Sequence, residues 1–126
     1  MLKLIVIAVT ALGAYAQNLN YDVNNEITIR VQVLRAHVSS TVEEPHPQFV
    51  VETQEERLMD LYVAPTRFMA SQEINIPEGA KIRVTANVVL MPDGSDLLIA
   101  REIEVGRMIY VVRDHRGNPI WEFFGF

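Results

Sequence analysis

Histidine is the residue type in this chain best suited to metal binding or acid–base chemistry, and it occurs as His37, His46 and His115. A metal centre needs several ligands that converge at fixed distances. His46 follows two glutamates in a proline-containing loop, but no ligand spacing is met there. His115 lies in a turn that Asp114 and Gly117 explain, because Asp hydrogen-bonds the backbone two residues on and Gly adopts a positive φ. We therefore predict no metal centre and no cofactor.

The sequence contains no pattern typical of a catalytic site. It has no G-x-S-x-G turn, no glycine-rich phosphate loop and no H-E-x-x-H motif. It also has no cysteine, which excludes cysteine nucleophiles, iron–sulfur clusters and disulfide bonds. Glu102 and Glu104 lie on one face of the same predicted strand, close enough for the carboxylate pair of a glycosidase. Glutamates at every second position are, however, typical of the solvated face of a strand. We predict that the protein is not an enzyme. The candidates for binding a small ligand or a metal are His46, His115, Tyr62 and Arg101.

Four aromatic residues lie close together in the C-terminal segment: Trp121, Phe123, Phe124 and Phe126. One interpretation is that they cap the open end of a barrel, since a small domain needs its large apolar side chains in the core. The other is that they dock onto a larger protein, since exposed apolar clusters mark interfaces. We take them as the candidate partner-binding residues.

Residues 1–16, MLKLIVIAVTALGAYA, have the layout of a secretory signal peptide. Lys3 precedes an apolar run, and Ala14-Tyr15-Ala16 is an A-x-A cleavage site. The run is shorter than the about 20 residues that a membrane-spanning helix needs. We therefore predict an exported protein, periplasmic or extracellular, with no stable membrane span. The alternative is that residues 1–16 are retained as an anchor.

The charge balance is acidic, with 16 Asp and Glu residues against 11 Lys and Arg residues and a formal net charge of −5. Nucleic acids and anionic lipid surfaces favour basic partners, so we predict binding to neither and expect another protein as the partner. A polar face could combine basic residues with an aromatic one, as in barrels that bind single strands, but the net charge opposes that function. Its members would be Arg30, Lys81, Arg83, Arg101 and Tyr62. The oligomeric state stays open.

Alternating apolar and polar residues predict a mainly β-sheet protein. The clearest strand covers residues 81–88, where every second residue from Ile82 to Val88 is apolar. Pro65 can begin one or two helical turns, and Arg101 interrupts the alternation of its strand, which predicts a bulge or a charged edge. The expected strands cover residues 27–33, 49–53, 58–63, 81–88, 97–105 and 108–112, and the helical turns cover residues 65–72.

Three strands, a short helix, two strands and an extension follow one another along the chain. This is the order of the OB-fold, a small, partly open Greek-key barrel. We predict an all-β protein: an OB-like Greek-key barrel of five to six strands over residues 17–126, with one short helix between strands 3 and 4. A signal helix precedes the barrel and the aromatic tail follows it. The alternative is another small β-barrel or a sandwich.

Five segments between residues 46 and 121 carry a resemblance to known proteins. They are HPQFVVET at 46–53, LYVAP at 61–65, IPEGAKIRVT at 76–85, LIAREI at 98–103 and RDHRGNPIW at 113–121. They resemble a loosely defined set of uncharacterised exported bacterial proteins with an OB-like barrel, and more remotely small periplasmic OB-fold stress proteins. The chain departs at Ala64 and Asn87, where such proteins tend to have glycine. The resemblance implies a barrel and export, and no catalytic residue.

These observations together predict a non-enzymatic, exported OB-like binding module. Its expected role is that of an accessory or interaction subunit in an envelope or extracellular assembly. The alternative is a periplasmic protein that binds a small ligand or a metal.

Overall fold

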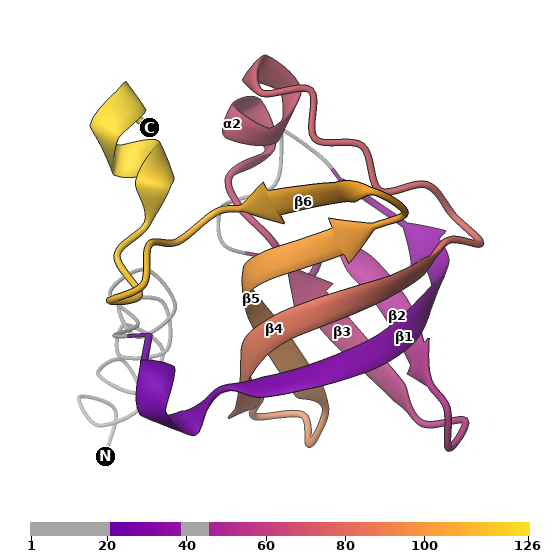
Figure 1. Cartoon of the computed structure of the whole chain (residues 1–126). Helices are drawn as coiled ribbons and strands as arrows, with labels where there is room; N and C mark the ends of the chain where they lie inside the picture. The colour runs from indigo at the N-terminus through magenta and orange to yellow at the C-terminus, as the bar shows by residue number, and fades with distance from the viewer. Residues whose placement is uncertain (1–20, 39–45) are drawn as a thin grey trace, which may run out of the picture.

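The computed structural model describes residues 21–38 and 46–126 (Figure 1). Its strands are β1 (Ile27–Ala36), β2 (Phe49–Thr53), β3 (Leu58–Tyr62), β4 (Lys81–Leu90), β5 (Asp96–Val105) and β6 (Met108–Val111). The helices are η1 (Val23–Asn25), α2 (Thr66–Ser71) and η2 (Ile120–Phe124), of which η1 and η2 are 3-10 helices. The predicted signal peptide, residues 1–16, lies outside the described residues. No helix within the described ranges is long and apolar enough to cross a membrane.

Five of the strands close into a barrel (Figure 1). Antiparallel pairs give the order β3-β2-β1-β4-β5, and a parallel pair between β3 and β5 joins the two ends. This cyclic order, with helix α2 between the third and fourth strands, is the OB topology. The predicted fold class is confirmed. The sixth strand, β6, pairs with the second half of β5 outside the barrel and has no strand on its other side among the described residues.

The alternation in β4 produces a dry inner face and a polar outer face. Ile82, Val84 and Ala86 are at most 3% exposed. Lys81, which precedes Ile82, and Arg83, which follows it, are exposed. Burying a side chain of the size of Ile82 or Val84 contributes about 1.5–3 kcal/mol. The other barrel strands and α2 contribute to the same core. The outer face of β4 is exposed at Lys81 and Arg83, whereas part of the outer face of β5 is covered by a second buried cluster that contains Tyr21, Leu97 and Ile99.

Two irregularities interrupt the strand pairing. The register between β4 and β5 shifts by one residue at Arg101, which confirms the bulge predicted there. A similar shift lies in β1 between Val33 and Arg35. Because of this bulge β1 pairs with β2 as far as Ala36, beyond the predicted end at residue 33.

Candidate functional site

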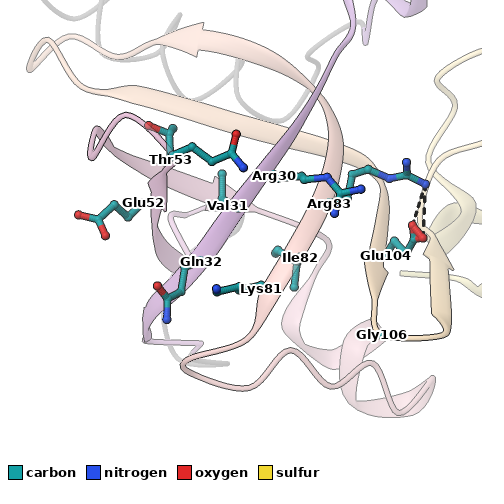
Figure 2. Close-up of a pocket in the computed structure, with 11 residues that line it drawn as sticks. Arg30, Val31, Gln32, Glu52, Thr53, Lys81, Ile82, Arg83, Glu104 and Gly106 are labelled. Carbon is teal, nitrogen blue, oxygen red and sulfur yellow. Dashed lines mark hydrogen bonds and ion pairs between the residues drawn. The ribbon is translucent and has the colours of Figure 1, made fainter.

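A shallow groove crosses the outer face of the barrel over β1 and β4 (Figure 2). Its volume is about 550 Å³. Val31 and Ile82 lie on its floor with their side chains in the core, so the residues on either side of them point outward. The charged and amide side chains that line it are Arg30, Gln32, Glu52, Gln54, Lys81, Arg83 and Glu104.

The strand register arranges the charges of the groove in rows. Arg30 lies opposite Arg83, and Arg83 lies opposite Glu104. The Arg83 Nη2 donates to both carboxylate oxygens of Glu104, at 2.7 and 3.3 Å (Figure 2). In the next row Gln32 lies opposite Lys81. Within the described part of the chain Arg30 and Lys81 form no ion pair, and neither does Glu52, which also lines the groove on the far side of Gln32.

A polar network fastens the segment before β1 to the barrel. The Tyr21 hydroxyl donates to a carboxylate oxygen of Glu26 at 2.7 Å, and Arg101 Nε donates to the same oxygen. The side chain of Asn87 accepts from the backbone N–H of Asp22 at 2.8 Å and donates to its carbonyl at 2.9 Å. The departure from glycine at Asn87 therefore has a structural role, which is to hold the backbone of Asp22.

The same network shifts the acidities of its members. Burial raises the pKa of Tyr21 well above its usual 10.0, and the hydrogen bond to the Glu26 carboxylate raises it further. Burial alone would raise the pKa of Glu26, but the hydrogen bonds from Arg101 and Tyr21 outweigh it and lower that pKa below the usual 4.5. Arg101, one of the predicted ligand-binding residues, is thus paired with an ionised Glu26.

Arg113 joins this segment to the C-terminal tail. Its side chain is buried at 6% exposure, and its guanidinium carbon lies 5.3 Å from the ring centroid of Tyr21 and 5.1 Å from that of Trp121. Its Nη1 donates to the carbonyl of Gly117 at 3.0 Å. Burial lowers the pKa of Arg113. A cation held between two rings is favourable even without a carboxylate, and here it fixes the base of the tail.

The aromatic tail is divided between core and surface. Trp121 is 8% exposed and belongs to the main core. Phe68 of α2 holds the tail, with ring centroids 6.2 Å from Trp121 and 5.6 Å from both Phe124 and Phe126. Phe123 is 79% exposed, Phe124 55% and Phe126 42%. The tail is therefore anchored on one side and presents apolar rings on the other.

The four predicted ligand-binding residues do not form one site. His46 is buried just before β2, and Tyr62 is buried in a small second cluster. His115 is exposed in the turn after β6, while Arg101 pairs with Glu26. Across residues 21–38 and 46–126, no group of three or more His, Asp or Glu side chains could hold a metal ion.

The polar face predicted from the sequence is present in part. Three of its five members line the groove, namely Arg30, Lys81 and Arg83. Arg101 does not, because its bulge directs it to Glu26, and Tyr62 is buried. Sequence reasoning missed the role of Asn87. The available signal was an asparagine inside a strand, where this residue type is uncommon.

The chain is similar to one protein family and to a solved structure. Residues 31–110 match the model of a family described as the MamS/MamX magnetosome protein family. Among solved structures, the chain is similar to Rim1, a mitochondrial single-stranded DNA binding protein from S. cerevisiae, at 16% identity and a TM-score of 0.41, over 65% of this chain and 92% of that chain. No curated protein gave a match. The OB assignment rests on the strand pairing alone.

Proposed function

The chain belongs to the MamS/MamX magnetosome protein family, and we propose that it acts there as a non-enzymatic, exported module that binds another protein. The observation that carries this proposal is the exposed aromatic tail. Its surface is built by Phe123, Phe124 and Phe126, which we call the phenyl surface. The family description supports a partner among the proteins of the magnetosome.

The phenyl surface is held in place rather than loosely attached. The buried ring of Trp121 fixes its base, and Phe68 contacts both Phe124 and Phe126. The turn after η2 is closed by a hydrogen bond from the Phe126 N–H to the Trp121 carbonyl at 3.1 Å. An ordered surface loses little conformational freedom on binding, which favours affinity.

A protein is the partner that suits this surface best. Aromatic side chains are enriched in the centres of protein interfaces and carry much of their binding energy. Glu122 lies within the same segment, and the whole chain has an excess of acidic residues. Both features disfavour an anionic lipid surface, which attracts basic segments.

Absence of catalysis is part of the proposal and rests on the sequence and on how the polar groups are used. No catalytic motif occurs in the sequence. Glu104, which lines the groove, is bonded to Arg83, and Glu26, which does not, is bonded to Arg101 and Tyr21. These carboxylates serve structural hydrogen bonds, which supports a binding role over acid–base catalysis.

The test replaces one exposed ring of the phenyl surface. Phe123→Ser removes a side chain that is 79% exposed, and the matched control Leu90→Ser removes one that is 72% exposed at the end of β4. The full chain carries an affinity tag and is recovered from magnetosome-containing cells, and co-purifying proteins are quantified by mass spectrometry. We expect Phe123→Ser to lose about tenfold or more of one specific partner, while Leu90→Ser retains it.

The comparison requires that both variants have the melting temperature of the wild-type protein. Exposed positions of this kind change stability by about 0.5 kcal/mol or less, so retained folding is expected. Equal recovery of every co-purifying protein with folded Phe123→Ser and with wild type would overturn the proposed partner-binding role.

A further inference from the structure

We propose that the groove over β1 and β4 is a separate binding site for a ligand that carries two or more carboxylate groups. It is distinct from the phenyl surface and does not depend on the function proposed for it. The residues that carry the inference are Arg30, Lys81 and Arg83, together with Glu104 (Figure 2).

The first observation is an arrangement of like charges that the fold alone does not need. Arg30 and Arg83 are direct cross-strand neighbours in an antiparallel pair, and such like-charge pairs are destabilising. Lys81 lies two residues from Arg83 on the same face of β4. Three of the 11 basic residues of an acidic chain thus line one groove over two adjacent strands.

The second observation is that only one of these cations forms an ion pair within the described residues, although Glu52 also lines the groove. Arg83 is bonded to Glu104 through both carboxylate oxygens. Arg30 and Lys81 form no ion pair there. The Arg83–Glu104 contact also shows that the groove can hold a carboxylate against a guanidinium, which is the chemistry proposed for the ligand.

The third observation is the shape and lining of the groove. Its volume of about 550 Å³ lies within the range of small-molecule sites. Gln32 and Gln54 add amide donors and acceptors beside the cations. A ligand carboxylate at Arg30 and a second one at Lys81 would receive charge-assisted hydrogen bonds, which are the stronger kind.

A ligand with two or more carboxylates can be of two kinds: a free small polycarboxylate, or a protein segment with acidic side chains. Citrate represents the first source and a short polyglutamate peptide represents the second. Binding of each probe to the purified full chain is measured by isothermal titration calorimetry at low ionic strength, where exposed charges are least screened. Binding of citrate alone identifies the small-molecule source, and binding of the peptide alone identifies the protein segment.

The variant Arg30→Gln/Lys81→Gln removes the two cations that are not paired with Glu104. Its matched control is Arg67→Gln/Arg116→Gln, which makes the same change in net charge at two exposed arginines that do not line the groove. We expect the groove variant to weaken binding of the active probe by about tenfold or more, and the control variant to change it less than about threefold.

A third variant predicts an effect of opposite sign. Glu104→Gln removes the carboxylate that competes for Arg83, so we expect it to tighten probe binding severalfold. A merely structural role for these charges would not produce a gain in affinity. The proposal is overturned if neither probe binds the wild-type chain, if the two double variants weaken binding equally, or if Glu104→Gln leaves the affinity unchanged or lower.

Discussion

At the scale of single residues, the structure depends on a few polar contacts that join the N-terminal segment to the barrel. Asn87 holds the backbone of Asp22, while Glu26 links Tyr21 to Arg101. The contacts of Asn87 with Asp22 and of Arg101 with Glu26 could not be predicted from the sequence, because they join residues that are distant in the chain. The sequence did predict the bulge, because Arg101 is polar at a position where the alternation of the strand requires an apolar residue.

Gly117 is the glycine whose replacement should cost most. It has a φ of +91°, and a Cβ added there would lie 2.9 Å from the Tyr21 carbonyl oxygen. Gly94 has a similar φ of +88° but open space around it. We expect Gly117→Ala to lower the free energy of unfolding by about 3 kcal/mol and Gly94→Ala by about 1 kcal/mol, as measured by urea denaturation. Equal losses in the two variants would contradict the contact with Tyr21.

Glu26 should make the stability of the protein depend on acid pH. Its pKa in the folded state is lowered below 4.5, so its contribution is fully present above pH 4.5 and is lost as the pH falls through the folded-state pKa. We expect Glu26→Gln to flatten the loss of stability below pH 4.5, measured by urea denaturation across that range. The control Glu55→Gln, at an exposed turn position, should keep the wild-type slope; an unchanged slope in Glu26→Gln would refute this role.

At the scale of elements, the strands were predictable and the tail was not. In β4 the predicted alternation of buried and solvated side chains holds from Lys81 to Ala86. Beyond the register shift between Thr85 and Ala86 it is wrong, since Asn87 is buried and Val88 is 43% exposed. The tail was predicted only as four aromatic residues, either buried or exposed. In the structure Trp121 is buried in the core. Phe124 and Phe126 each pack against Phe68 and stay partly exposed to solvent. No periodicity in the sequence distinguishes these two environments over six residues.

Phe68 should control both stability and the position of the tail. It is 3% exposed and contacts three rings of the tail. We expect Phe68→Ala to lower the free energy of unfolding by about 3–5 kcal/mol, and to shift the fluorescence of Trp121, the single tryptophan, toward that of a solvated indole.

The matched control for this variant is Leu58→Ala, whose side chain is 60% exposed. It should change stability by about 0.5 kcal/mol or less and leave the tryptophan spectrum unchanged. If Phe68→Ala were no more destabilising than Leu58→Ala, α2 would not be the support of the tail.

At the scale of the whole molecule, net charge and local charge have different consequences. The acidic total, −5 by formal count, led to the prediction that nucleic acid is not a partner. The strand register nevertheless gathers Arg30, Lys81 and Arg83 on one face. Composition cannot show such a cluster, because it arises only when β1 and β4 are paired in this register.

The barrel thus carries two surfaces of different chemistry on one scaffold. The groove lies over β1 and β4, and the phenyl surface lies on η2 and the residues after it, against Phe68 of α2. Since fold alone does not determine function, the account depends on these surfaces and not on the OB topology.

Site-specific photo-crosslinking tests whether the phenyl surface binds another protein. A photoreactive phenylalanine analogue replaces Phe123 in the full chain within magnetosome-containing cells, and a second sample carries it at the exposed position Leu90. The account predicts one discrete covalent adduct with another protein from position 123 and none from position 90. No adduct from position 123, or the same adducts from both positions, would contradict it.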